Sequence, residues 1–130
     1  MPRLTMIQGH PDPSGNRLCH ALADAYAEGA AAGGHEVIRI EVARLDFPIL
    51  RTREEFETGQ LPESLTDAQR AIVSAEHLLM IFPLWHGTMP ALLKAFIAPG
   101  SPSSIANTAS RRGYLLGVRR GSSLRWGCQR

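Results

Sequence analysis

The sequence has 130 residues, of which 44% are hydrophobic and 20% are charged, which is the composition of an ordinary globular protein with one domain. Its net charge of +2 hides an asymmetry, because all 12 acidic residues lie between Asp12 and Glu76 and every charged residue after Ile97 is an arginine. The two cysteines, Cys19 and Cys128, lack the spacing of a zinc site or a disulfide framework, so we predict no bound metal.

No apolar run is long enough to cross a bilayer as a helix. The first residues, M-P-R-L-T-M-I, read as the opening of a strand and lack the apolar stretch and the small-residue cleavage site of a signal peptide. We therefore expect a cytoplasmic protein with no membrane partner.

The chain opens with the pattern of a strand, a helix and a second strand. Residues 4–8 (L-T-M-I-Q) predict a short strand, and the loop that follows, G-H-P-D-P-S-G-N, is dense in turn-forming residues. A helix is expected to start near Asn16, because apolar residues then recur at intervals of three and four until Gly33 and Gly34 end it. The alternating residues 35–41 predict a second strand parallel to the first.

The loop after the first strand is a candidate anion site. A strand, a tight loop and the N-terminus of a helix together present backbone N–H groups to an anion. The glycine spacing differs from that of the dinucleotide motif G-x-G-x-x-G. The residues by themselves therefore indicate an anion site that is not the dinucleotide motif.

A second helix is expected from the capping patterns in S-L-T-D-A-Q at residues 64–69. The apolar run 78–82 (L-L-M-I-F) lacks alternation and predicts a parallel strand that is buried on both faces. Pro83 stops this strand, so the turn P-L-W-H-G must leave the sheet at the carboxyl end. Thr88 is the expected N-cap of a short helix, with Pro90 in its first turn. In an open α/β sheet, ligands bind at this end of the strands.

The residues around this turn resemble those of the flavodoxin-like NAD(P)H:quinone oxidoreductase family. Phe82, Pro83 and Leu84 match the family's F-P-L, and residues 90–94 (P-A-L-L-K) match its P-A-x-L-K at the same spacing. The resemblance implies that the turn lies along the isoalloxazine ring of a bound flavin. The flavin-binding residues implied in this turn are Pro83, Leu84, Trp85, His86 and Gly87.

The first loop carries the same resemblance. Gly9, His10 and Pro11 match the family's G/A-H-P, and the resemblance places His10 against the pyrophosphate or ribityl chain of the flavin. The residues that it places around the phosphate are Ser14, Gly15, Asn16, Arg17 and Leu18. Gln69 stands 14 residues before Pro83, the separation at which the family has a glutamine beside the flavin.

The resemblance also implies the fold and the activity. The expected fold is a three-layer α/β, flavodoxin-like, doubly wound parallel sheet with strands in the order 2-1-3 and the remaining strands of the family missing. The expected activity is the two-electron reduction of a quinone-like acceptor by NAD(P)H through bound FAD, or alternatively FMN, in a homodimer. His86 departs from the family's usual aromatic residue, so no catalytic residue is assigned.

The resemblance covers residues 1–97, which we interpret as the N-terminal part of a flavin-binding domain, and residues 98–130 form a separate tail. The tail is rich in Ser, Gly and Arg and is expected to be poorly ordered. We interpret it as a frameshift product, because its codons, re-read in another frame with permitted wobble bases, can encode the family's next strand and a T-M-G-M-P loop. Tryptophan has only one codon, so the last base of the Trp126 codon and the first two bases of the Gly127 codon can encode only glycine in the shifted frame, which is the glycine of this loop.

Two other functions stay open. The chain is alternatively a non-catalytic truncated fragment of the family, whose third strand is an exposed hydrophobic edge that invites association. The arginines of the tail also fit a nucleic-acid-binding arm. The frameshift accounts for these arginines more simply, so we expect no nucleic-acid partner.

Overall fold

A single sheet with the strand order β2-β1-β3-β4-β5 runs through the part of the chain that the structure describes. The structure is a computed structural model that describes residues 2–58, 62–98, 113–119 and 122–127, with side chains for residues 2–55 and 62–98. The strands are β1 (Arg3–Gln8), β2 (Glu36–Glu41), β3 (His77–Pro83), β4 (Gly113–Arg119) and β5 (Ser122–Gly127). The first four run parallel to one another, and β5 is antiparallel to β4.

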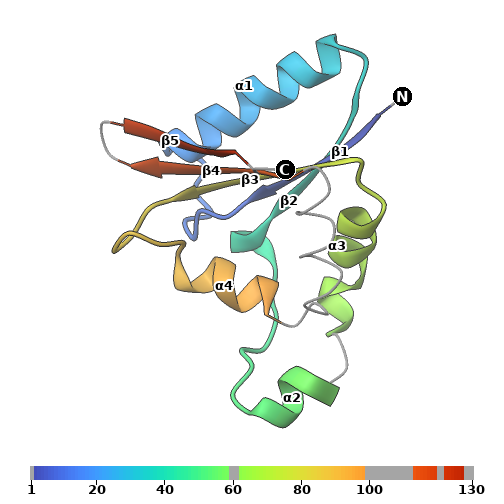
Figure 1. The fold of residues 1–130 in the computed structure, drawn as a ribbon, viewed down its shortest axis with the longest axis vertical. Coiled ribbons are helices and arrows are strands. Elements are labelled where there is room, and N and C mark those ends of the chain that lie inside the picture. Colours follow the sequence, from blue (N-terminus) through green and yellow to red (C-terminus); the bar gives the residue numbers. More distant parts are fainter. Residues whose placement is uncertain (1, 59–61, 99–112, 120–121, 128–130) are drawn as a thin grey trace.

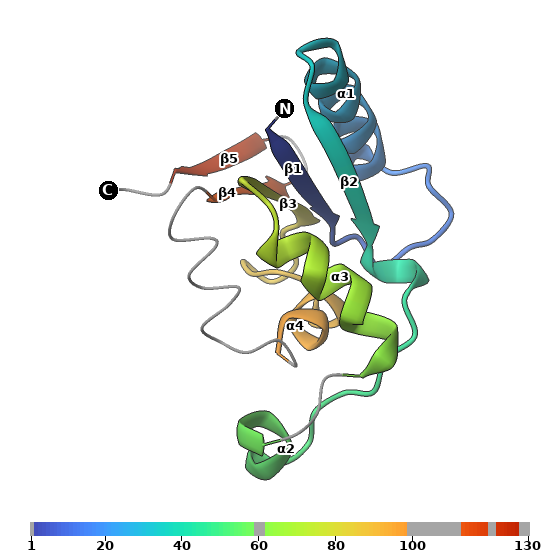
Figure 2. The same cartoon turned by 90° about the vertical axis from the view of Figure 1, so that its right-hand side faces the viewer.

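Helices cover both faces of the sheet. The helices are α1 (Leu18–Ala32), α2 (Arg53–Thr58), α3 (Glu63–Val73) and α4 (Ala91–Ile97), with a 3-10 turn η1 (Val42–Arg44) after β2. Figures 1 and 2 show α1 on one face, α3 and α4 on the other, and α2 standing away from the sheet. Among the described residues, no helix combines the length and the apolar character needed to cross a bilayer.

Two hydrophobic clusters hold these layers together. Successive side chains of β1 point to opposite faces of the sheet, so Leu4 and Met6 pack with Ala23 of α1. Ile7 packs on the other side with Ile72 of α3. Both faces of the central strands are therefore buried, which explains why residues 78–82 of β3 form an apolar run without alternation.

The structure confirms the α/β class and the order 2-1-3 of the first three strands. The expectation that the sheet ends at β3 needs correction, because β4 pairs with β3 from Leu78 opposite Gly113 to Pro83 opposite Val118. The exposed edge expected at β3 is therefore covered. Backbone N–H and C=O groups make this pairing, and almost any sequence supplies them. The division of the chain after residue 97 and the frameshift origin of the tail stay predictions.

The structure confirms the start of the first helix and moves that of the second. The first helix begins at Leu18 with Arg17 as its N-cap, close to the start expected near Asn16. The helix α3 begins at Glu63, directly after a proline, so residues 64–69 lie inside the helix and do not cap it. Proline at or beside a helix start costs little, because the first N–H groups of a helix have no partner within it.

Candidate functional site

The loop after β1 leaves the sheet in close contact with β3 and α4. The backbone N–H of Gly9 donates to the carbonyl oxygen of Ile81 at 2.7 Å, which extends the pairing of β1 with β3 by one residue. A Cβ atom on Gly9 would lie 2.6 Å from Cδ2 of Leu93. Only glycine lets the loop pass this close to α4.

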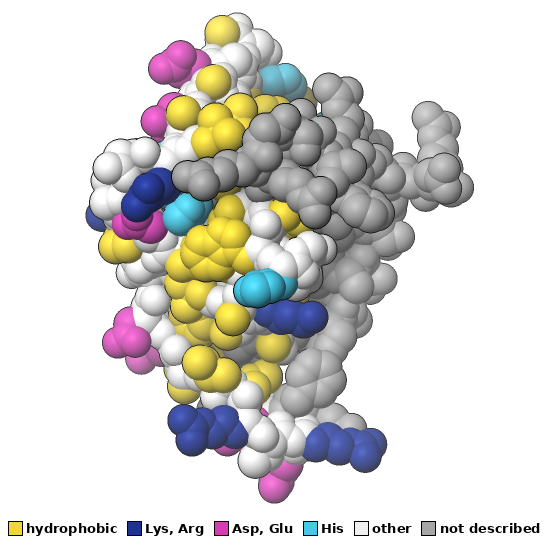
Figure 3. Space-filling view, turned by 90° about the vertical axis from the view of Figure 1, so that its left-hand side faces the viewer, with side chains coloured by type: hydrophobic (Ala, Val, Ile, Leu, Met, Phe, Trp, Pro, Cys, Tyr) yellow, Lys and Arg dark blue, Asp and Glu magenta, His cyan; other side chains and the backbone are white. Residues whose placement is uncertain are grey.

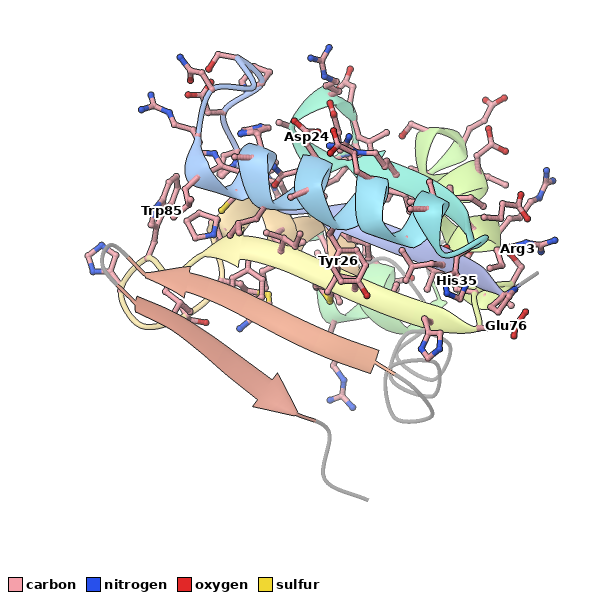
Figure 4. All side chains as sticks on the ribbon, turned by 90° about the horizontal axis from the view of Figure 1, so that it is seen from above. Arg3, Asp24, Tyr26, His35, Glu76 and Trp85 are labelled. Atoms are coloured by element: carbon pink, nitrogen blue, oxygen red, sulfur yellow. The ribbon has the colours of Figure 1, made fainter. Side chains whose placement is uncertain are left out.

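Three ring side chains from separate elements meet at this end of the sheet. The ring centroids of His10 and Trp85 are 5.7 Å apart and the rings are nearly perpendicular, at 81°. The ring of His20, a buried residue of α1, lies 5.4 Å from that of His10. Trp85 exposes 47% of its surface, and Figure 4 shows it at the end of the sheet opposite Arg3 and Glu76. The loops after β1 and β3 thus converge where the sequence predicts a ligand.

Arg17 and Asp12 form an ion pair across the first loop. The carboxylate of Asp12 accepts a hydrogen bond from Nε of Arg17 at 3.0 Å and another from the backbone N–H of Ser14 at 2.9 Å. The hydrogen bonds from Ser14 and, after them, the one from Arg17 hold the pKa of Asp12 well below its ordinary value of 3.8. The charge of Arg17, which the sequence assigns to the phosphate, is therefore paired within the protein.

His10 is held as a neutral imidazole. Its Nδ1 accepts the backbone N–H of Asp12 at 3.0 Å, so the ring proton is assigned to Nε2. Burial lowers the pKa of His10 below 6.5, and the neighbouring His20 lowers it further. Asp12 raises the pKa by less than either of these, and Arg17 has the smallest effect, which is to lower it. The Nε2–H group of His10 is therefore a hydrogen-bond donor at neutral pH.

The loop offers fewer backbone donors than the sequence suggests. Its N–H groups at Gly9, His10, Asp12 and Ser14 already donate within the protein. Within the described part of the chain, the N–H groups of residues 15 and 16 donate to no protein acceptor. Anion binding by the backbone is thereby narrowed to these two residues and the first turn of α1.

The turn after β3 has the geometry of a two-residue hairpin loop. Trp85 and Thr88 exchange two backbone hydrogen bonds, of 3.0 and 3.1 Å. The two residues between them, His86 and Gly87, have φ values of 52° and 76°, the left-handed pair that defines a type I′ turn. Thr88 therefore closes the turn, and the expectation that it caps α4 is wrong because Pro90 is the N-cap.

Gln69 lies apart from these rings. It lines a pocket of about 740 Å³ between α3 and β2, together with Ile38 and Val73, and neither His10 nor Trp85 lines that pocket. The role of Gln69 stays a prediction.

Two residues of this region were not predicted from the sequence. Gln8 accepts the backbone N–H of His10 at 2.8 Å, and Nδ1 of His20 faces the backbone N–H of Arg17 at 3.4 Å. Each had a weak signal. Gln8 is a polar residue at the end of an apolar strand, and His20 stands three residues after the N-cap, at the second position of a capping box.

The residues present fit a flavin. Figure 3 shows hydrophobic side chains gathered over this end of the molecule, with His side chains beside them. A Cβ atom on Gly15 or Gly87 would meet nothing within 4 Å, so the backbone at both loops is open to a ligand. Trp85 supplies an exposed aromatic face and His10 a donor. Among the described residues, no group of His, Cys, Asp or Glu has the arrangement to hold a metal ion.

Comparisons with known proteins agree with this fold. The ribosyldihydronicotinamide dehydrogenase-like protein traD of Penicillium crustosum is 28% identical over 114 residues, which cover 73% of this chain and 42% of that protein. The NAD(P)H:quinone oxidoreductase of Methanothermobacter marburgensis superposes with a TM-score of 0.64 at 24% identity, over 80% of this chain and 55% of that one. FerB, a flavoenzyme NAD(P)H:(acceptor) oxidoreductase of Paracoccus denitrificans, gives a TM-score of 0.66 at 17% identity, over 90% and 60%.

This chain thus spans about half the length of these relatives. The two solved structures share its fold, with β1 and β3 at the centre of a parallel sheet in this protein. The model of the family described as having a flavodoxin-like fold matches residues 2–98, and the chain belongs to that family.

Proposed function

We propose that this chain carries the flavin site of an NAD(P)H oxidoreductase that reduces quinone-like acceptors by two-electron hydride transfer. The observation that carries the proposal is the meeting of His10 and Trp85, from two loops, at the carboxyl ends of β1 and β3. Flavin and nucleotide ligands of doubly wound sheets bind at this place. The relatives support the activity, because two are named as NAD(P)H oxidoreductases and the third as dehydrogenase-like.

Each loop offers a different contact in this proposal. The exposed face of Trp85 stacks on the flat ring system. The Nε2–H of His10 donates to the ribityl or pyrophosphate group, and the N–H groups of residues 15 and 16 hold the phosphate beside the positive end of α1. The remaining residues proposed to line the site are Ser14, Arg17, Leu18, Pro83, Leu84, His86 and Gly87.

A bound flavin would supply the transfer of a hydride from NAD(P)H, which becomes NAD(P)⁺, to the acceptor, which would also take one proton from water. The protein binds and orients the reactants and limits the access of water. The proposed flavin is FAD, with FMN as the alternative. The proposal includes a homodimer, as the family resemblance implies, because a second copy could bring Gln69 to a site that it does not reach within one chain. A cytoplasmic location fits the free, buried thiol of Cys19.

The test is to purify the protein and titrate it with FAD and with FMN, followed by flavin fluorescence and by the oxidation of NADH and NADPH with a benzoquinone acceptor. We expect saturable flavin binding and acceptor-dependent NAD(P)H oxidation, both reduced by Trp85→Ala. Sedimentation of the same samples measures the oligomeric state. A folded protein that binds neither FAD nor FMN and does not oxidise NAD(P)H would be the non-catalytic fragment of the family. This result would contradict the proposal.

A further inference from the structure

A relay of hydrogen bonds between side chain and backbone runs along the first loop. At three alternate positions, a side chain accepts the backbone N–H of the residue two places further on. Gln8 Oε1 accepts from His10 at 2.8 Å, His10 Nδ1 from Asp12 at 3.0 Å, and Asp12 Oδ1 from Ser14 at 2.9 Å. The side chain of Ser14 continues the series with a hydrogen bond to Asn16 Oδ1 at 3.0 Å. Gln8 is the first residue of this relay.

Gln8 is a buried residue at the end of an inner strand of the sheet. It ends β1 between two neighbouring strands, opposite Glu41 of β2 and Ile81 of β3, and exposes 2% of its surface. By the alternation of β1 it follows Leu4 and Met6 on the face that α1 covers. Most strand residues at such a place are apolar, because burying an amide is unfavourable unless its polar atoms are hydrogen-bonded.

Only half of the Gln8 amide has a partner. Its oxygen accepts the N–H of His10, whereas its Nε2 has no hydrogen-bond partner within the described structure. An apolar side chain of similar length would avoid burying this unpaired donor. The oxygen atom is therefore the feature of Gln8 that the loop uses.

The backbone N–H of His10 depends on this acceptor because no carbonyl oxygen of the sheet accepts it. The pairing of β1 with β3 ends one residue earlier, where Gly9 donates to Ile81. The bond to Gln8 turns the backbone at His10 and places the imidazole where Nδ1 meets the N–H of Asp12. The ring then lies against Trp85 and points its remaining nitrogen, Nε2, away from this bond.

We propose that Gln8 is a positioning residue of the candidate site, which fixes the place and the Nε2–H tautomer of His10 by accepting its backbone N–H. The inference deepens the proposed function, on which it rests for the identity of the ligand. The hydrogen-bonding state of His10 can be measured without any ligand, so the inference about Gln8 and the proposed function can be tested separately.

The experiment compares Gln8→Met, which removes both polar atoms, with Gln8→Glu, which keeps an acceptor oxygen at the same place. Thr5→Val is the matched control, because Thr5 is also a fully buried polar residue of β1 and its hydroxyl donates to Ala71 on the other face of the sheet, at 2.8 Å. Nuclear magnetic resonance of the flavin-free full chain reports the His10 tautomer through its ring nitrogen shifts, and the Asp12 amide shift reports the bond to Nδ1. Titrations with FAD and with FMN follow on the same samples.

In the wild-type protein and in Thr5→Val, we expect His10 to be in the Nε2–H form. Gln8→Met should give a mixture of both tautomers and move the Asp12 amide signal upfield, because the bond to Nδ1 is weakened. The same variant should raise the FMN Kd by about tenfold. A folded Gln8→Glu should restore the Nε2–H tautomer. A wild-type tautomer and Asp12 shift in Gln8→Met would overturn the inference. If the tautomer responds as expected but the wild-type protein binds neither FAD nor FMN, the role of Gln8 stands and the proposed function fails.

Discussion

Gly9 and Leu93 touch where the first loop leaves the sheet, and they leave no room for a side chain between β1 and α4. A methyl group on Gly9 would lie 2.6 Å from Cδ2 of Leu93, a side chain that is completely buried. This contact ties the position of the His10 loop to the helix that follows the Trp85 turn, so packing at one point sets the spacing of both loops.

Gly9→Ala is therefore expected to destabilise the protein by about 1–3 kcal/mol, the usual cost of overpacking. Leu93→Ala alone should cost about 2–5 kcal/mol because it leaves a cavity. The double variant should cost less than the sum, because the new methyl group occupies part of that cavity. Urea unfolding of the four proteins measures the coupling, and strictly additive values would show that the two residues do not compete for space.

Trp85→Ala should weaken flavin binding in a version of the chain with its reading frame restored. An aromatic stacking contact contributes about 0.5–1.5 kcal/mol beyond its buried area, so we expect the flavin Kd to rise about tenfold. Trp85→Phe should retain most of the affinity. Tyr26→Ala is the matched control, because Tyr26 is a half-exposed aromatic residue of α1 that lies away from Trp85 (Figure 4). Equal flavin content in Trp85→Ala and wild type would show that Trp85 does not contact the flavin.

Gly87→Ala and Gly29→Ala should change stability in opposite directions. Neither new methyl group would meet an atom within 4 Å, so only the backbone conformation differs between the two sites. Gly87 has a φ of 76° in the Trp85 turn, where alanine costs about 1–2 kcal/mol. Gly29 is a helical residue of α1, where alanine should add about 0.5–1 kcal/mol. Thermal unfolding distinguishes them, and a lower Tm for both variants would contradict the assigned turn geometry.

The stability of the protein should depend on the protonation of His10. Because burial lowers the pKa of His10 below 6.5 in the folded state, the unfolded chain binds this proton first as the pH falls. The contribution of neutral His10 to the free energy of unfolding is fully present above pH 6.5. It is lost as the pH falls below 6.5 towards the pKa of His10 in the folded protein. His10→Asn should remove this dependence while keeping the loop, because asparagine also accepts the N–H two residues on.

Urea unfolding of both proteins across this pH range measures the effect. Above pH 7.5 the stability difference between His10→Asn and wild type should be constant, which serves as the internal control. A difference that stays constant through pH 6 and below would show that His10 has its ordinary pKa in the folded protein.

The coding DNA should carry an insertion or deletion, not a multiple of three, close to the codons of Ile97 and Ala98. Resequencing tests this, and the alternative frame should remain open past the codon of Arg130. The version with the restored frame should bind flavin more tightly than the 130-residue chain, because the T-M-G-M-P loop would then contact the ring from another side. Stop codons early in the alternative frame would rule out the frameshift, and the arginine-rich tail would require a function of its own.

The central strands and the end of the sheet where their loops meet follow from the sequence by itself, whereas the order 2-1-3 was implied by the family resemblance. The unbroken apolar residues of β3 specify a strand buried on both faces, and Pro83 fixes where the chain turns out of the sheet. Parallel strands bring their carboxyl ends to the same edge, so the loops holding His10 and Trp85 had to converge. These features depend on periodicity and on the chemistry of single residues, which a sequence displays directly.

Tertiary structure decided which donors and acceptors pair. Thr88 is suited both to capping a helix and to closing a turn, and the bonds with Trp85 select the turn. Arg17 carries a charge that suits a phosphate, yet the carboxylate of Asp12 takes it. The contact of His20 with His10 and the buried amide of Gln8 depend on how α1 packs on the sheet. A polar side chain has several possible partners along the chain, and only the distances and burial of the folded state choose among them.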